Sequence, residues 1–449
     1  MATSSPHHPL SSANVGALLN RAGDGVELQA STWVMALTAA ELQPWRPSAG
    51  QGFSPSASRG ESSAVQVGVQ SSVALAALNM TRRSLRDTAR VLGVTRSFLS
   101  GLELAELFYA DVVAPIVDKA LAGVSYSAAL IGWGSEVQGF DTQRSTDHAW
   151  GPRMQLFLGR NEFLARANEL DALLDHELPA EFRGYPVRFA FPSDAPARHW
   201  VHVTDLRDFF TEHLGADPAG GLATSVWLTV PTQVLRELTG GMVFHDGLGL
   251  LEPYRKELAW FPDDVWRYVL ACQWMRLSQE EPFVGRCGEV GDDLGSAVVA
   301  ARQVRDLMKL CLLMNRVYPP YSKWLGTAFA ALPCALGLTP HLSDALSARR
   351  WQEREQHLSS AYEIAAGLHN ELGLTEPLDV EVRYFHDRPF RVLDAYRFTN
   401  ALVSTISDPA LSALPPVGAI DQYVDNTDLT DRTHAELRRR YIAGPGLDF

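Results

Sequence analysis

The chain has 449 residues, enough for two or three domains, and 46% of them are hydrophobic and 20% charged, the balance of a soluble globular protein. It contains neither an uninterrupted apolar run of about 18 residues nor a basic start followed by an apolar stretch, so we expect no membrane span, no secretion signal and a cytoplasmic location. The net charge of −13 disfavours non-specific binding to nucleic acid, which needs a basic surface. The four cysteines form no Cys-x-x-Cys pair, which predicts buried free thiols rather than a structural zinc site.

The N-terminal part of the chain divides into two predicted segments. Residues 1–80 are rich in Ser, Ala, Gly and Pro, and we expect this extension to be largely disordered because it offers little apolar surface to bury. Residues 81–100 carry five arginines and helix-capping residues, which predicts a basic helical lead-in to the next domain. A weaker alternative is half of a helix-turn-helix, with Val73–Leu78 as the only short candidate upstream for its third helix.

Residues 101–216 are predicted to form a compact domain with a small mixed sheet. Apolar residues at helical spacing predict a helix from Gly101 to about Leu121. Hydrophobic alternation and helical periodicity then predict, in order, a strand at Tyr126–Ile131, a strand at Arg153–Leu158, a helix at Asn161–His176 and short strands at Val187–Ala190 and Trp200–Val203.

Beyond Asp217 the pattern becomes helical. Helices are predicted at Val230–Thr239, Asp264–Glu281, Leu294–Tyr318, Leu342–Ala366 and Phe390–Ile406. We interpret His245 and Asp246 as part of a turn. The fold class is therefore α+β, with a small mixed-sheet domain followed by an all-helical domain at 217–430 and a tail at 431–449.

The segment from Leu130 to Arg153 carries the clearest functional pattern. Gly132 and Gly134 permit a tight turn whose backbone N–H groups face outward. Ser135 is predicted to begin a helix, so that its hydroxyl and the positive helix end bind phosphate. Asp147, placed on the adjoining strand, would hold the Mg²⁺ that the phosphates also contact.

This layout resembles the polymerase-β-type nucleotidyltransferase superfamily, whose signature is Gly-Ser, a spacer and Asp-x-Asp. Gly134, Ser135 and Asp147 match, and the intervening Gly139 is also typical. The resemblance implies a nucleotidyltransferase fold at 101–216, with ATP or another nucleoside triphosphate as substrate and Mg as cofactor.

The helical half resembles the domain of unknown function 4037, which accompanies such cores in bacterial proteins. The matching stretches are Pro262–Ser296 and Tyr318–Phe329. Together the two resemblances cover roughly residues 101–430. They imply a fold and a reaction class rather than a particular substrate.

Two positions depart from the superfamily pattern. The second carboxylate of Asp-x-Asp is replaced by Ala149, which has no donor atom for a hard cation. On the candidate third strand, Trp200–Val203, the site-facing position is predicted to hold His202, and Asp205 just past the strand is an alternative metal ligand. The pocket is therefore better equipped to bind a nucleotide than to transfer part of it.

The helical half offers further candidates. The resemblance to two-domain antibiotic nucleotidyltransferases suggests Glu280 or Glu281 as general base, and the alternative is a solvated acidic helix end. Lys323, beside aromatic residues, suits a triphosphate or a stacked base, with a structural role as the alternative.

Three basic residues recur along the long central helix and need partners, either the acidic loop 289–293 or a phosphate. They are Arg302, Arg305 and Lys309.

The leading functional hypothesis is a nucleotidyltransferase-like protein that binds a nucleoside triphosphate with Mg²⁺. If active, it would transfer a nucleoside monophosphate to a hydroxyl of a small molecule or protein. The alternative is a catalytically impaired nucleotide sensor or partner-binding protein. A weaker alternative is a DNA-binding regulator that uses residues 81–100.

Overall fold

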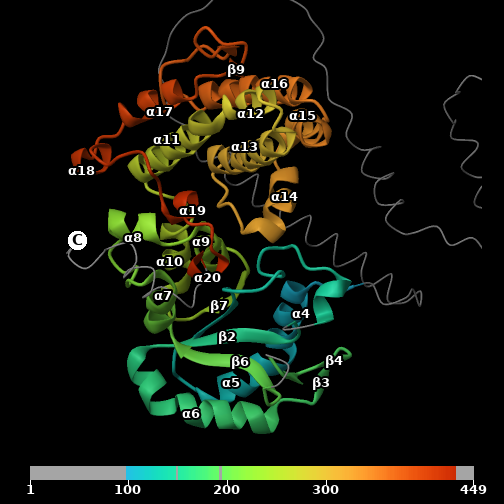
Figure 1. Ribbon diagram of the computed structural model, residues 1–449. Helices are drawn as coiled ribbons and strands as arrows, with labels where there is room; N and C mark the ends of the chain where they lie inside the picture. Colours follow the sequence, from blue (N-terminus) through green and yellow to red (C-terminus); the bar gives the residue numbers. More distant parts are fainter. Residues whose placement is uncertain (1–97, 148–149, 192–194, 431–449) are drawn as a thin grey trace, which may run out of the picture. The chain divides into compact units, whose positions relative to one another are not determined.

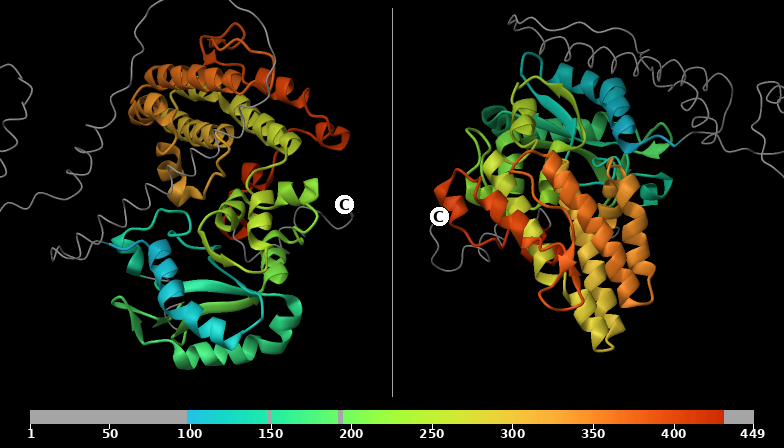
Figure 2. Two further views of the ribbon diagram at one scale, coloured as in Figure 1. Left: turned by 180° about the vertical axis from the view of Figure 1, so that it is seen from behind. Right: turned by 90° about the horizontal axis from the view of Figure 1, so that it is seen from above.

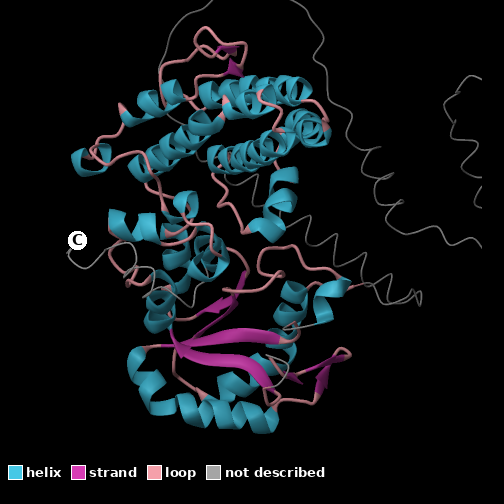
Figure 3. Cartoon of the chain, viewed as in Figure 1, coloured by secondary structure: helices cyan, strands magenta, loops and turns pink. Residues whose placement is uncertain are grey.

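The computed structural model describes residues 98–147, 150–191 and 195–430 (Figure 1). Several predictions concern residues outside these ranges. They are the disorder of residues 1–80, the basic lead-in up to residue 97, the tail at 431–449 and the loss of a carboxylate at Ala149. The DNA-binding alternative therefore stays a prediction. The described residues confirm the α+β class, with a sheet flanked by helices in the first half of the fold and a second half that is mostly helical (Figure 3).

The centre of the first half is a five-stranded mixed sheet with the order β5-β6-β2-β1-β7. The neighbouring strands β2 and β6 run parallel, and the other neighbouring pairs run antiparallel. The strands are β1 Ser127–Leu130, β2 Arg153–Leu158, β5 Arg188–Phe189, β6 Arg198–Asp205 and β7 Met242–Asp246, and β3 Glu181–Phe182 and β4 Tyr185–Pro186 form a separate hairpin.

One face of this sheet is covered by helices from residues 101–177. The predicted helix from Gly101 is confirmed as a continuous rod that contains one π-helical turn. Its parts are α4 Gly101–Phe108, η1 Tyr109–Val113 and α5 Ala114–Ala120, and α6 Arg160–Glu177 lies beside it (Figure 1). Met154, Leu156 and Leu158 of β2 point into the core that these helices close.

The opposite face of the sheet packs against the helical half. Phe157 and Ile131 belong to a core that continues through Phe209 and Phe210 of α7, Leu206–Leu214, into the helices beyond. This core ties the sheet to the helical half. Because successive strand residues alternate between faces, Arg153 and Gln155 point to the same side as Phe157.

The helical half follows the predicted elements closely (Figures 1 and 2). The single helix predicted at Leu342–Ala366 is divided at residues 348–350, and the one predicted from Phe390 is preceded by a short strand. The helices are α8 Thr224–Thr229, α9 Thr232–Thr239, α10 Leu251–Glu257, α11 Asp263–Glu280, α12 Phe283–Glu289, α13 Asp293–Met314, α14 Ser322–Ala330, α15 Ala335–Ser347, α16 Trp351–Glu371, α17 Tyr396–Val403, α18 Pro409–Ser412, α19 Ile420–Tyr423 and α20 Thr427–Thr430, with β8 Arg383–Tyr384 and β9 Arg391–Val392.

The interpretation of His245 and Asp246 as part of a turn was wrong, because both residues belong to β7, which pairs with β1. Asp246 accepts a hydrogen bond from the Ser127 hydroxyl at 2.7 Å. It also accepts the backbone N–H of Glu252 in the first turn of α10, at 3.0 Å. One residue therefore joins the strand to the helix that follows it.

Two predictions from composition can be compared with the described residues. The four cysteines are free thiols, as expected, but only Cys272 and Cys311 are buried, whereas Cys287 and Cys334 are half-buried. Among the helices that the structure describes, none has the length and apolarity needed to cross a membrane.

Candidate functional site

The Gly-Ser segment forms a tight turn at the end of β1. Gly132 and Gly134 adopt φ angles of +84° and +131°, a region that favours glycine. The helix predicted to begin at Ser135 is absent there, and a single turn stands in its place. The turn closes with two hydrogen bonds of a Schellman motif, Phe140 N–H to Ser135 O at 2.9 Å and Gly139 N–H to Glu136 O at 3.0 Å. Gly139, at φ +74°, thus ends the turn before a helix can extend.

A buried ion pair holds this turn against the sheet. Arg153 and Glu136 approach to 2.6 Å, and each side chain is only 3% exposed. The Arg153 guanidinium also donates to Trp133 O and lies 4.1 Å from the centre of the Trp133 ring. The Gln155 side chain bonds both the N–H and the C=O of Ile131 at 3.1 Å. The turn is therefore fixed by side chains from β2.

The acidic residues near this turn do not form a described metal site. Asp147 belongs to a short 3₁₀ helix, Gln143–Asp147, so its predicted place on the adjoining strand was wrong, because β2 begins only at Arg153. Glu136 is engaged by Arg153, and Asp141 accepts Gly101 N–H at 2.7 Å and the Trp150 indole N–H at 3.1 Å. Among the side chains that the structure describes, which do not include that of Asp147, no group of three or more His, Cys, Asp or Glu residues could hold a metal ion. Magnesium binding by Asp147 therefore stays a prediction.

A cavity of about 500 Å³ opens beside the turn, within the roughly 300–1,000 Å³ range of small-molecule pockets. We call it the glycine–serine cavity. It brings Gly134 and Ser135 together with Lys323 of α14, three of the predicted phosphate-binding residues, while Gly132 is not among its lining residues. The Lys323 ammonium lies 4.8 Å from the centre of the Trp324 ring. The remaining lining residues are Trp133, Glu136, Gln138, Thr142, Arg144, Ser145, Trp150, Phe191, Gln233, Glu237, Tyr321, Trp324, Thr427 and Thr430.

The structure places Asp205 away from this cavity. In the parallel pairing of β2 with β6, Arg153 is level with Trp200, whereas Asp205 is level with Leu158 at the far end of the strands. Five residues of strand correspond to about 16 Å. Asp205 caps α7 there by accepting Asp208 N–H at 2.9 Å. His202, level with Gln155, is exposed.

Glu280 and Glu281 also lie outside the lining of the glycine–serine cavity. Glu280 forms an ion pair with Arg302 at 2.8 Å. Glu281 is buried and accepts the backbone N–H groups of Leu393 at 2.8 Å and Ala395 at 3.1 Å. Burial raises the pKa of Glu281 to about 7, although these N–H groups act in the opposite direction. The described contacts give both carboxylates structural partners, so the general-base role stays a prediction without support from this geometry.

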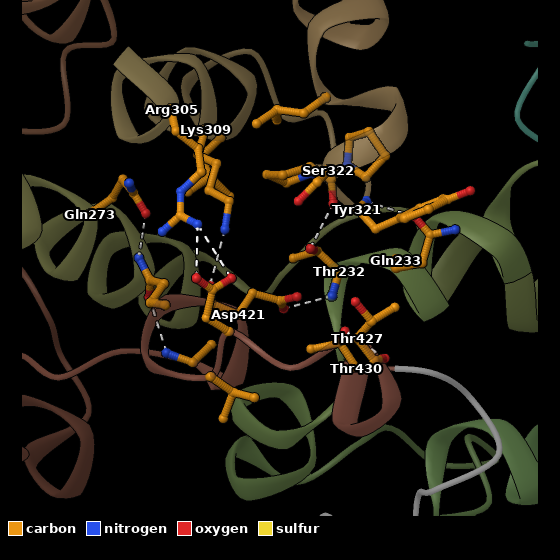
Figure 4. Close-up of a pocket in the computed structure, with 18 of the residues that line it drawn as sticks. Thr232, Gln233, Gln273, Arg305, Lys309, Tyr321, Ser322, Asp421, Thr427 and Thr430 are labelled. Carbon is orange, nitrogen blue, oxygen red and sulfur yellow. Dashed lines mark hydrogen bonds and ion pairs between the residues drawn. The ribbon is translucent and has the colours of Figure 1, made fainter. Parts of the chain in front are cut away.

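A second cavity, of about 100 Å³, lies between α9, α13 and the segment 419–430. We call it the Lys309 cavity. Figure 4 shows Arg305 and Lys309 reaching from α13 toward the segment that carries Asp421. Lys309 donates to the backbone carbonyl of Asp421 at 3.2 Å, and Arg305 contacts both carboxylate oxygens of Asp425 at 3.3 Å.

The partners of these basic residues were missed in the sequence. Among the described contacts, the cations of α13 pair with Glu280, Asp306, Asp425 and the backbone of residue 421 rather than with the loop 289–293. The need for partners was visible in the sequence, but nothing in it indicated that Arg305 and Lys309 contact residues more than a hundred positions later.

The two cavities share a wall built from α9, α14 and α20. Four residues line both cavities: Gln233, Tyr321, Thr427 and Thr430. The Gln233 amide accepts Tyr321 N–H at 3.0 Å and donates to the Glu237 carboxylate at 2.7 Å. The wall is thereby cross-linked by hydrogen bonds.

Comparison with known proteins bears on the helical half. Residues 227–325 match the family model described as Domain of unknown function (DUF4037), which confirms the predicted resemblance. The matched range contains Lys323, Arg305 and Lys309. No curated protein matches the chain significantly.

Among solved structures, the chain is similar to a nucleotidyltransferase-like protein from Exiguobacterium sibiricum, with 10% sequence identity. The match covers 66% of this chain and 88% of the other, and its TM-score is 0.28.

Proposed function

We propose that this protein binds a nucleoside triphosphate in the glycine–serine cavity. The observation that carries this proposal is that Gly134, Ser135 and Lys323 line one cavity. Lys323 lies nearly two hundred residues after the glycine–serine pair in the sequence. Backbone N–H groups at a glycine turn and an ammonium group are suitable contacts for phosphate oxygens. The aromatic ring of Trp324 also lines the cavity and offers a surface on which a base stacks.

Nucleotide binding is better supported than nucleotidyl transfer. Transfer in this chemistry requires metal ions that neutralise the phosphates, and carboxylate oxygens are the preferred ligands of Mg²⁺. Asp147 is the one acidic residue that matches the superfamily signature, and the second position of that signature is Ala149. The second candidate function is therefore transfer of a nucleoside monophosphate to a hydroxyl acceptor, with Asp147 holding Mg²⁺.

Binding is tested by calorimetric titration of the full chain with ATP and other nucleoside triphosphates, each with and without Mg²⁺. We expect Lys323→Met to weaken binding about tenfold or more, because it removes a charge-assisted contact worth roughly 1.5–3 kcal/mol. Lys256→Met is the matched control, since Lys256 is exposed on α10 and lines neither cavity. Equal affinities of the wild type and Lys323→Met, or no binding at all, would refute the proposal.

Transfer is tested by release of pyrophosphate from ATP, in the wild type and in Ala149→Asp. Binding without release identifies a nucleotide-binding protein that has lost catalysis. Release that appears only in Ala149→Asp indicates that the remaining parts of a transfer site are intact. Release by the wild type itself would show that Ala149 is compatible with catalysis.

A further inference from the structure

The Lys309 cavity differs from the glycine–serine cavity in size. Its volume of about 100 Å³ holds several water molecules or one compact polyatomic anion. It is well below the roughly 300–1,000 Å³ of pockets for larger small molecules, so a whole nucleoside does not fit. Any ligand that enters must be small or must insert only one small group.

Four charged residues line this cavity, two of each sign: Arg305, Lys309, Asp421 and Asp425. Behind its wall, Arg276 and Asp306 form a further ion pair at 3.1 Å. The positive and negative charges therefore balance only while both lining carboxylates stay in place.

The two lining carboxylates are held very differently. Asp421 accepts the Thr232 N–H at 2.8 Å, at the first residue of α9, and this contact fixes it to the wall. Asp425 is 80% exposed, and its described contact is the ion pair with Arg305 at 3.3 Å. An ion pair so open to solvent stabilises a protein by about 0–1 kcal/mol. Asp425 is thus the carboxylate that another anion can replace at little cost.

Displacement of Asp425 would leave Arg305 and Lys309 with one carboxylate in the lining, that of Asp421. Behind the wall, Asp306 lies 3.8 Å from Arg305 but is shared with Arg276. Lys309 has three N–H donors, of which one is directed to the Asp421 carbonyl. Hydroxyl groups of Ser322 and Thr427 line the same space. Burial lowers the pKa of Lys309, and a bound anion would oppose that shift.

We propose that the Lys309 cavity is a binding site for a compact anionic group, a phosphate or a carboxylate, which takes the place of the Asp425 carboxylate at Arg305 and Lys309. The anion is separate from the nucleotide of the glycine–serine cavity. The shared wall supports this separation, because the Gln233 amide, which lines both cavities, is held in place by hydrogen bonds to the Tyr321 N–H and to the Glu237 carboxylate. The anion site does not depend on nucleotide binding.

The test is calorimetric titration of the full chain with inorganic phosphate and, separately, with acetate, at constant ionic strength maintained with chloride. We expect Asp425→Asn to tighten binding of the preferred anion about tenfold, because the competing carboxylate is gone. We expect Lys309→Met to abolish this binding. Asp379→Asn, which removes a carboxylate from another exposed ion pair, with Arg383, is the matched control and leaves the affinity unchanged.

The two anions distinguish the chemical source of the group, since the tighter binder shows whether the site is shaped for phosphate or for carboxylate. Unchanged affinity in Asp425→Asn would overturn the proposal even if Lys309→Met failed to fold, because Asp425 is exposed and its replacement does not disturb the core. Equal anion affinities of the wild type and a folded Lys309→Met would also overturn the proposal. So would an Asp425→Asn variant that binds neither phosphate nor acetate.

Competition with ATP separates this proposal from the proposed function. Phosphate that binds equally well in the presence of saturating ATP supports a separate site. If phosphate and ATP exclude each other, and Lys309→Met binds neither, the proposal of a separate site is overturned. Arg305 and Lys309 would then bind the phosphates of the nucleotide itself. Phosphate binding without any ATP binding leaves the anion site standing while the proposed function fails.

Discussion

Each cavity is lined by a carboxylate that pairs with an arginine, and the two pairs differ in burial and in geometry. Beside the glycine–serine turn, Arg153 and Glu136 are 2.6 Å apart and each is 3% exposed. At the Lys309 cavity, Arg305 and Asp425 are 3.3 Å apart, with exposures of 27% and 80%. The same two chemical groups therefore meet in opposite solvent environments.

This difference assigns the pairs different roles. Removing one member of a buried pair leaves a charge in a place where water cannot solvate it, so the pair acts as a fixed structural unit. An exposed pair is screened by salt and solvated when it opens, so its members can exchange partners. The first pair holds the turn that shapes one cavity, and the second is suited to admit a competing anion to the other.

The comparison predicts its largest effect at Glu136. We expect Glu136→Ala to lower the free energy of unfolding by about 3–5 kcal/mol, because Arg153 would remain buried without its carboxylate. Chemical denaturation measures this change. The control is the double variant Glu136→Ala, Arg153→Met, which removes the stranded charge and should recover part of the loss. A loss below about 1 kcal/mol in the single variant would mean that the turn does not depend on this pair.

Glu281 extends the comparison to a buried carboxylate held by backbone N–H groups. Its pKa is raised from 4.5 to about 7, chiefly by burial, so between these values the folded protein binds a proton that the unfolded chain does not. This contribution to the free energy of unfolding is complete below pH 4.5 and is lost as the pH rises through 7, a change of up to about 3 kcal/mol.

We expect Glu281→Gln, which cannot titrate, to remove this part of the pH dependence. Denaturation at pH 5 and pH 8 should show the variant gaining stability relative to the wild type as the pH rises. Glu280→Gln, one residue earlier in an ion pair with Arg302, serves as the control. Parallel stability curves for the wild type and Glu281→Gln would contradict the prediction.

Gly134 tests how closely the buried pair approaches the turn. A Cβ at this position would overlap the Arg153 guanidinium and lie 2.7 Å from a Glu136 carboxylate oxygen, and φ is +131°. We expect Gly134→Ala to cost about 1–3 kcal/mol through strain and displacement of the pair. Gly139→Ala is the matched control: φ is +74°, but a Cβ there would meet nothing within 4 Å. Equal unfolding free energies for the two variants would mean that the pair contributes nothing to the requirement for glycine at Gly134.

The sequence predicted those elements whose pattern is local. β2 has the predicted bounds, and the long helix α13 was expected, because apolar spacing within a few residues determines both. β7 was missed, because five residues between glycine-containing turns carry little pattern, and its partner β1 lies more than a hundred residues earlier. The prediction of a helix from Ser135 was wrong, because Gly139 adopts a positive φ and the hydrogen bonds around it end the turn there.

The candidate site was predictable only in part, for the same reason. The Gly-Ser turn and Lys323 were each suggested by local sequence, and the structure brings them to one cavity. The charges of α13 were recognised as needing partners. The partner of Arg305 in the structure, Asp425, reaches it because the chain after α17 returns to α13, and no short sequence pattern predicts that path.

The smallest predicted effect on stability is at the exposed pair. We expect Asp425→Asn to change the free energy of unfolding by less than about 1 kcal/mol, and the change should shrink further as salt is added. Glu136→Ala should retain most of its cost in salt, because buried charges are screened weakly. A loss of several kcal/mol in Asp425→Asn would mean that the carboxylate is a structural member of the wall. An anion could then replace this carboxylate only at a similar cost in stability. The stability and the anion affinity of Asp425→Asn together decide whether an anion can replace Asp425 in the Lys309 cavity.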